Sequence, residues 1–359
     1  MEEVTDVEGG GPLAGIRILD LSAVVSGPMA TMVLADQGAD VIKVEPPGWG
    51  DGIRFLGASN NGVGAMFSMI NRNKRSIGVN WKHPEGVALL RQLAQRSDAL
   101  LQNYRPGKLD RAGLGYDDLH ALNPKLVYAS INGVGETGPH AGQKVYDYVI
   151  QGISGATDTQ RSGEREMFRT IVYDKVTALT AAQGITAALL ARERGAGGQH
   201  VRLSMLDAGL QFNWPDLMWN YTFDDPGAQL AGDLADSYEV NETADGAIVS
   251  HALQGDTSAY STEEMIEFFA KNDMPVGRAN RRAEVADDPQ VRATGGLVTY
   301  DHPRAGLLRQ PRPSVRFEGT PAGIRRPSPE VGEHTVEVLS ELGLDADAMR
   351  ALASQGIIG

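Results

Sequence analysis

The sequence predicts an α/β protein in which a parallel sheet is followed by a smaller α+β portion. Two observations lead to this prediction. Over roughly the first 210 residues, short β-branched runs alternate with longer amphipathic stretches, which is the order found in βαβ units. After about residue 225, two strands occur side by side and helices follow them. A chain of 359 residues, 42% of them hydrophobic, is long enough for one large or two medium domains.

The first βαβ unit is predicted between residues 15 and 47. Residues 15–22 are typical of a buried strand, because β-branched and leucine residues run up to a polar turn. Residues 27–39 have apolar side chains at helical spacing and a glycine near the end of the pattern. Residues 40–47 form a second strand that stops at two prolines.

The same alternation continues along the chain, and each further element is predicted in turn. Helices are expected in 83–98, 116–124 and 176–194, and strands in 99–104, 125–133 and 199–205.

The C-terminal part has a different pattern. Residues 236–253 contain two strands around an Ala-Asp-Gly turn. Residues 261–272 form a helix that opens with a capping box, in which Ser261 and Glu264 satisfy each other's backbone amides. A short helix and loop follow in 281–295, and two helices are predicted in 327–358.

Composition excludes several classes of function. The net charge of −13 argues against non-specific nucleic-acid binding, which needs clustered positive charge. The absence of cysteine excludes disulfides, thiolate metal sites and a cysteine nucleophile. Residues 1–12 are acidic and glycine-rich, so we expect a flexible segment and no signal peptide. The longest apolar stretch is too short and polar to span a bilayer, and we expect a cytoplasmic protein with no membrane partner.

The common cofactor motifs are missing. The glycines near the N-terminus precede the first strand, whereas a dinucleotide fingerprint follows it, so the sequence does not predict a nicotinamide or flavin cofactor. No Walker sequence, HExxH motif, paired His/Cys spacing or G-x-S-x-G elbow occurs. We therefore expect no metal.

Basic residues form two groups despite the acidic composition. One group, NRNKR (71–75), precedes a strand-like run, and the other, NYRPGKLDR (103–111), follows a strand. Ligands of open α/β sheets bind outside the carboxyl ends of the strands, and arginine there favours phosphorylated ligands. The alternative interpretation is a pair of solvated loops.

Asp174, in the stretch IVYDKVTALT, has two interpretations that do not exclude each other. Aspartate is among the best N-cap residues, because its carboxylate accepts the free amides of the first helical turn. A carboxylate at a helix N-terminus is favoured in its ionised form, and an ionised carboxylate can attack an activated carbonyl group.

Taken together, the motifs resemble class III CoA-transferases, the group that also contains α-methylacyl-CoA racemases. The resemblance covers most of residues 12–210 and much of 275–359, in stretches that include LAGIRILDLS, NRNKRSIGVNWKHPEG and IVYDKVTALTAAQGITAALLARERGAGGQHVRLSMLDA.

The resemblance implies a covalent mechanism. Asp174 would attack an acyl-CoA to form a mixed anhydride, the released CoA would convert it to an aspartyl-CoA thioester, and an acceptor acid would take the CoA. Tyr146 and Asp147 resemble a Tyr-acidic pair beside this site. The racemase alternative needs a histidine where this chain has Tyr146, unless His140 or His251 reaches Asp174. A CoA-binding protein without catalysis is a third possibility.

The resemblance also implies CoA contacts at matching positions, while two departures change the expected contacts. Pro46 replaces an arginine found in some relatives, and the glycine-rich loop of formyl-CoA:oxalate transferases is not seen, so oxalate is not the expected acceptor. The glutamate that supports the racemase site maps near Glu242 in this sequence. The expected CoA contacts are Val24, Val25, Ser26, Asn73, Lys74, Arg75, Asn103, Tyr104, Arg105, Arg111 and Lys144.

Finally, the resemblance implies how the chain is organised. A Rossmann-like large domain would be formed by both chain ends, residues 13–215 and 301–359. The middle, residues 216–300, would form a small domain that is several tens of residues shorter than usual. Two chains would interlock as a homodimer.

Overall fold

The computed structural model describes residues 10–159, 163–251 and 255–359, so most of the N-terminal segment expected to be flexible lies outside the described residues. The chain divides into two compact units. The larger joins the residues up to Phe212 to Val298–Gly359, and the smaller is Asn213–Leu297. Analysis of the sequence placed the corresponding boundaries after residues 215 and 300.

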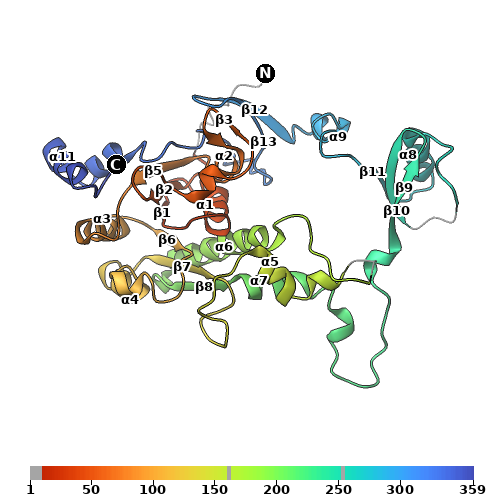
Figure 1. The fold of residues 1–359 in the computed structure, drawn as a ribbon, viewed down its shortest axis with the longest axis horizontal. Helices are drawn as coiled ribbons and strands as arrows, with labels where there is room; N and C mark the ends of the chain where they lie inside the picture. Colours follow the sequence, from red (N-terminus) through yellow and green to blue (C-terminus); the bar gives the residue numbers. More distant parts are fainter. Residues whose placement is uncertain (1–9, 160–162, 252–254) are drawn as a thin grey trace. The chain divides into compact units, whose positions relative to one another are not determined.

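The larger unit is built on a six-stranded parallel sheet, which confirms the predicted α/β class (Figure 1). The strand order is β5-β2-β1-β6-β7-β8, and every neighbouring pair is parallel. The strands are β1 (Arg17–Asp20), β2 (Asp40–Glu45), β5 (Lys74–Gly78), β6 (Ala99–Gln102), β7 (Val127–Asn132) and β8 (His200–Ser204).

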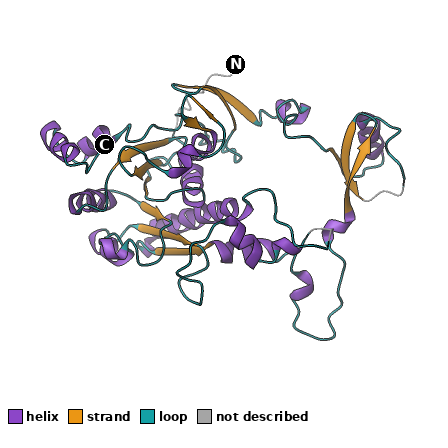
Figure 2. Cartoon of the chain, viewed as in Figure 1, coloured by secondary structure: helices purple, strands orange, loops and turns teal. Residues whose placement is uncertain are grey.

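Helices cover both faces of this sheet (Figure 2). One apolar cluster contains residues of α1 (Ser26–Asp36), α5 (Asp147–Ile153) and α6 (Val172–Ala191). The other contains residues of α3 (Pro84–Gln95), α4 (Tyr116–Leu122), α10 (Thr335–Glu341) and α11 (Ala346–Ser354). Neighbouring residues of a strand join opposite clusters, as Ile18 and Leu19 do, because side chains alternate across a sheet.

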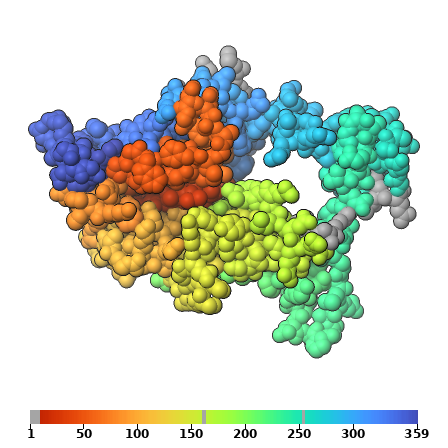
Figure 3. All heavy atoms as spheres, in the orientation of Figure 1, coloured from red at the N-terminus to blue at the C-terminus, as the bar shows by residue number. Residues whose placement is uncertain are grey.

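The last 60 or so residues return to the start of the larger unit. Arg75 on β5 forms ion pairs with Glu337 and Glu341 of α10, at 2.7 and 2.5 Å. Figure 3 shows the C-terminal atoms, in blue, against the orange N-terminal atoms. The shorter elements of this unit are β3 (Ser59–Asn60), β4 (Val63–Gly64), α2 (Ala65–Ile70), α7 (Met205–Asn213), β12 (Leu297–His302) and β13 (Gly306–Pro311).

The smaller unit contains an antiparallel sheet in the order β11-β10-β9. Strands β9 (Tyr238–Thr243) and β10 (Gly246–His251) form the predicted hairpin, and β11 (Val276–Arg278) pairs with β10. Helix α8 (Thr262–Lys271) opens with the predicted Ser261–Glu264 capping box. The short helix α9 (Pro289–Ala293) follows β11.

The carboxyl edge of the parallel sheet carries the loops that follow β1, β2, β6 and β7. Residues 103–111 lie in this group, directly after β6. Residues 71–75 do not, because β5 begins at Lys74, which pairs with Val41 near the start of β2. Only one of the two basic groups therefore lies at the edge where ligands of such sheets bind. Of the helices that the structure describes, none has the length and hydropathy needed to cross a bilayer.

Candidate active site

Asp174 lies in the first turn of α6, three residues after the N-cap residue Ile171. The prediction that Asp174 caps this helix is wrong, because the helix starts at Val172 rather than near Val176. Val172, one of the β-branched residues before Asp174, is part of the helix, although its type favours a strand. The Asp174 side chain is half-buried, and its carboxylate does not cap the N-terminus of the helix.

Asp147 performs the capping role from another helix. Its buried carboxylate accepts the backbone N–H groups of Tyr173 (2.6 Å) and Asp174 (3.1 Å), which are free amides at the start of α6. Gln151 donates to the other oxygen of Asp147 at 2.6 Å. A contact between residues 147 and 174 depends on tertiary structure, so local sequence patterns could not indicate it.

The N-terminus of α1 also lies near Asp174. The backbone N–H of Ser26, the first residue of α1, is close enough to the Asp174 carboxylate to lower its pKa. The partial positive charge of helix N-termini favours a carboxylate in this position. Asp174 is thus held between the first turns of two helices.

Burial raises the pKa of Asp174 to about 6, and the negative charge of Asp147 adds to the effect. The Ser26 amide lowers the pKa, although by less than the other two contributions raise it. The sequence led us to expect that the helix dipole would dominate. The carboxylate is still mostly ionised at pH 7, but it is more basic than an ordinary aspartate.

The turn between β1 and α1 is held by side chains from two other loops. Asn103 accepts the Ala23 N–H at 2.9 Å and donates to the Ala23 carbonyl at 2.7 Å. Asp51 accepts the Val24 N–H. Of the predicted contacts in this turn, the Val24 side chain is exposed, whereas Val25 is buried in a small apolar cluster.

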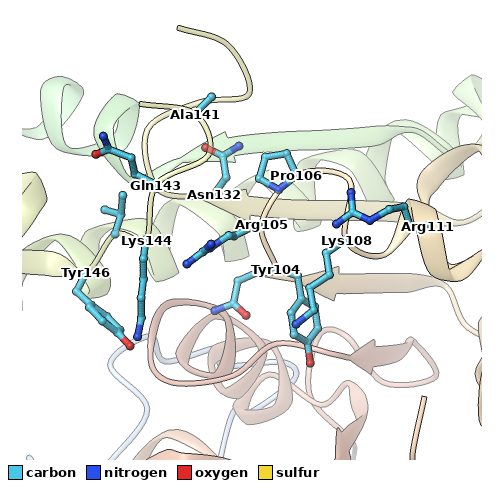
Figure 4. Close-up of a pocket in the computed structure, with 13 residues that line it drawn as sticks. Tyr104, Arg105, Pro106, Lys108, Arg111, Asn132, Ala141, Gln143, Lys144 and Tyr146 are labelled. Carbon is cyan, nitrogen blue, oxygen red and sulfur yellow. The ribbon is translucent and has the colours of Figure 1, made fainter. Parts of the chain in front are cut away.

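A cavity of about 540 Å³ opens beside this turn, and Asn103 belongs to both (Figure 4). Four of its thirteen described lining residues are cationic and none of them is acidic, and the lining comes from the end of β7 and the loops after β6 and β7. The cavity brings together six of the predicted site residues, namely Asn103, Tyr104, Arg105, Arg111, Lys144 and Tyr146. The Lys144 ammonium lies 5.0 Å from the centre of the Tyr146 ring.

One further cation belongs to this group, although the sequence analysis did not assign it. Lys108 lines the cavity, with its ammonium 4.3 Å from the Tyr104 ring centre. Burial lowers the pKa of Lys108, and the positive charges of Lys82 and Arg105 lower it further. Lys108 lies within the quoted stretch 103–111, so its charge was a usable signal. Cations that repel each other in this way would bind a polyanion favourably.

The structure gives Asn73, Lys74 and Arg75 a different task from the predicted CoA contact. They are buried and do not line the cavity, since they lie at the amino end of β5. Asn73 bonds to Asp36 and accepts the backbone N–H groups of two residues in the returning C-terminal segment.

The charges of the other two residues are neutralised within the chain. The Lys74 ammonium lies 2.9 Å from Asp20, and Arg75 lies 2.7 Å from Asp40 in addition to its pairs with α10. With their polar groups engaged, these residues tie the chain together.

The histidines of the racemase alternative are not brought to the cavity. No histidine is among its described lining residues, while His251 and the exposed Glu242 belong to the smaller unit. Within residues 10–159, 163–251 and 255–359, no group of three or more His, Asp or Glu side chains is arranged to hold a metal ion.

The titration of Asp174 tests this geometry without any substrate. In protein labelled with ¹³C at aspartate carboxyl groups, a signal that is absent from Asp174→Asn should titrate with a pKa of about 6. Asp147→Asn should lower this pKa, because the neighbouring negative charge is removed. Asp118→Asn, a change on the exposed surface of α4, should leave it unchanged. An Asp174 signal that titrates at an ordinary value would contradict the described environment.

Comparison with known proteins identifies the family. The model of CoA-transferase family III matches residues 13–259 and 248–335. The succinate–glutarate CoA-transferase of Agrobacterium fabrum is 33% identical over 383 residues, which cover 92% of this chain and 96% of that enzyme. The succinyl-CoA:glutarate CoA-transferase of Homo sapiens is 32% identical over 401 aligned positions, covering 99% and 91%. Because this chain has 359 residues, at least 42 of those positions have no counterpart here.

A solved structure agrees with these matches. The crystal structure of a CAIB/BAIF family protein from Brucella suis superposes with a TM-score of 0.81 at 27% identity, covering 93% of this chain and 100% of that one. The fold, the arrangement around Asp174, the match to the family model and the similarity to the two curated enzymes lead to one conclusion. The chain belongs to CoA-transferase family III and is a transferase enzyme.

Proposed function

We propose that this enzyme moves CoA from an acyl-CoA donor to a carboxylic acid acceptor, with Asp174 as the covalent nucleophile. The observation that carries the proposal is the position of the Asp174 carboxylate. It is half-buried, lies near the Ser26 amide, has a pKa of about 6 and belongs to a group of residues that adjoins a cationic cavity. Such a carboxylate is mostly ionised at pH 7 and more basic than a free aspartate, which favours nucleophilic attack.

The proposed reaction proceeds by four acyl exchanges. A carboxylate oxygen of Asp174 attacks the acyl carbon, the C–S bond breaks, and the CoA thiolate leaves a mixed anhydride. The thiolate then attacks the aspartyl carbonyl carbon, releasing the donor acid and forming an aspartyl-CoA thioester. The acceptor carboxylate attacks this thioester and releases thiolate, which attacks the acceptor's acyl carbon. Asp174 returns as a carboxylate, and no step consumes ATP because each activated group is exchanged for another.

The surrounding groups have defined roles in this scheme. The Ser26 N–H donates to the carboxyl group under attack and therefore stabilises the oxyanion that forms on it. Asp147 holds the first turn of α6 in place and keeps Asp174 basic. Tyr146 lines the cavity beside Lys144, and we assign its ring to the wall along which the pantetheine arm of CoA leaves the phosphate-binding cations.

The cavity fits the phosphorylated part of CoA. Arg105, Lys108, Arg111 and Lys144 supply positive charge, and the ring of Tyr104 offers an aromatic surface. Arginine binds phosphate through two parallel hydrogen bonds, whereas lysine acts as a point charge. Val24 and Val25 lie in the turn next to this cavity, so we assign them to the pantetheine end.

Small dicarboxylic acids are the substrates to test first. The two curated relatives described above are named for succinate and glutarate, and they cover nearly the whole chain. At least 42 aligned positions of the human relative have no counterpart in this chain, and we place this shortening in the small domain.

Trapping the covalent intermediate tests the proposal. Wild-type protein mixed with succinyl-CoA or glutaryl-CoA should gain the mass of a CoA adduct on the peptide that contains Asp174, and Asp174→Ala should gain none. The rate of adduct formation should be nearly constant above pH 7 and fall about tenfold per pH unit well below pH 6, because the nucleophile is then protonated.

Other outcomes separate the alternatives. Deuterium uptake from D₂O at the α-carbon of a 2-methylacyl-CoA, without an adduct, would favour the racemase. Measurable CoA binding with neither adduct nor exchange would favour a binding protein without catalysis. Either result would rule out Asp174 as an acyl-accepting nucleophile.

The cationic cavity generates a separate expectation about binding. Arg105→Ala and Lys144→Ala should each raise the KM for acyl-CoA by about tenfold, since each removes a charge-assisted contact with phosphate. They should change kcat far less, and the rise in KM should shrink at high salt. Arg350→Ala, an exposed arginine on α11, is the matched control and should leave KM unchanged. Equal effects of all three changes would contradict a CoA site in this cavity.

We also propose that two chains interlock as a homodimer. Large apolar side chains are exposed on two helices of the larger unit, including Leu179 and Leu190 on α6 and Phe212 on α7. Such exposure is typical of an interface between subunits. Light scattering should give about twice the chain mass of 38.4 kDa, and tagged and untagged dimers should not exchange chains without unfolding. A stable monomer would contradict this proposal.

A further inference from the structure

The turn between β1 and α1 contains a strained residue. Val24 has φ of +70°, in the left-handed region that β-branched residues very rarely adopt. Its side chain is 38% exposed, so packing does not force this conformation. Strain of this kind persists only where surrounding contacts impose it, and it concentrates at functional sites.

Asp51 holds Val24 in this conformation through hydrogen bonds to its backbone. Both of its carboxylate oxygens lie within hydrogen-bond distance of the Val24 N–H, at 3.1 and 3.3 Å. The Lys43 ammonium bridges Asp51 and the Ser22 carbonyl, at 3.1 and 3.0 Å, so the same ion pair holds the turn at two points. Asn103 holds Ala23 between them.

Asp51 is itself fixed and is not available to a ligand. It is 4% exposed, its backbone N–H donates to Glu45 at 2.8 Å, and its side chain caps the 3-10 turn Gly52–Phe55. It does not line the cationic cavity. A direct contact between Asp51 and the substrate is therefore not the reason for this arrangement.

The consequence falls on Asp174. Reversal of the chain at Val24 starts α1 at Ser26, whose N–H lies near the Asp174 carboxylate, and Val25 beside it packs in one apolar cluster with Ile171, the N-cap of α6. If Val24 returned to an ordinary φ, the Ser26 amide would turn away from that carboxylate. Fixing a donor before the reaction avoids its reorganisation during the reaction.

We infer that Asp51, paired with Lys43, is a positioning residue that holds Val24 in the left-handed conformation and thereby aims the Ser26 amide at Asp174. This inference rests on the proposed function, since it assigns the amide to the nucleophile of that reaction. The inference assigns to Asp51, which lies outside the cavity, the role of keeping the Ser26 amide close to Asp174.

Asp51→Asn tests the inference, with Asp36→Asn as the matched control. Both carboxylates are 4% exposed and paired with a buried cation, and Asp36 pairs with Arg72 at the other end of α1. Asp51→Asn should lower kcat for adduct formation by at least about tenfold, because the oxyanion donor is misplaced. KM for acyl-CoA should change by less than about threefold. Asp36→Asn should lower Tm to a similar extent and change kcat little.

Two readouts distinguish positioning from a general loss of stability. The acid limb of the pH–rate profile should move to higher pH in Asp51→Asn, because the Ser26 amide that favours the charged form of Asp174 is displaced while Asp147 still faces it. Adding Val24→Gly to Asp51→Asn should recover much of the lost kcat, since glycine adopts this φ without strain. An unchanged acid limb, or no recovery, would overturn the inference.

A second pair of variants keeps the test decisive if Asp51→Asn does not fold. Val24→Pro removes the N–H that Asp51 accepts and fixes φ near −65°, while the buried ion pair stays intact. Its kcat should be at least about tenfold below that of Val24→Ala, which keeps the N–H. Equal kcat values in the two variants would overturn the inference. A wild-type protein that forms no adduct would instead contradict the proposed function itself.

Discussion

The candidate active site depends on the contact between the Asp147 carboxylate and the first amides of α6. A helix start needs acceptors for its free N–H groups, and here the acceptor comes from another helix. The contact holds the backbone of Asp174 and places a second negative charge near its carboxylate. One interaction thus holds the start of the helix and adds to the rise in the Asp174 pKa that burial causes, so a change to it would alter both.

A buried network of charged side chains holds the turn between β1 and α1 rigid. Asp20 accepts a hydrogen bond from the Lys74 ammonium at 2.9 Å. Burial raises the pKa of Asp20, but the charges of Lys74 and Lys43 outweigh this effect and lower the pKa to about 2. Its oxygens also accept Ser22 and Thr31, on either side of the turn that reaches Asp174. Buried ions are costly unless every partner is present, so such a network tolerates little displacement. Lys74, which the sequence analysis assigned to the CoA site, is part of this buried network.

How much the sequence could predict depends on whether the signal was local. Alternating patterns were enough for the parallel sheet, the hairpin and the Ser261 capping box, because each reports on neighbouring residues. The loop 103–111 was placed correctly since it follows a strand. The start of α6 was missed because Asp147 stabilises it from a distance. Residues 73–75 were misjudged for the same reason, as their partners lie in segments that no local pattern identifies.

The return of the C-terminal segment has a consequence for synthesis of the chain. Arg72, Asn73 and Arg75 take partners 239, 250 and 262 residues later in the sequence. While the chain emerges from the ribosome, the first strands exist without the segment that satisfies these polar groups. Contacts of such long sequence separation form late and slowly. The N-terminal half therefore spends most of translation incomplete, and it is then that the nascent protein is most exposed to aggregation and most in need of chaperones.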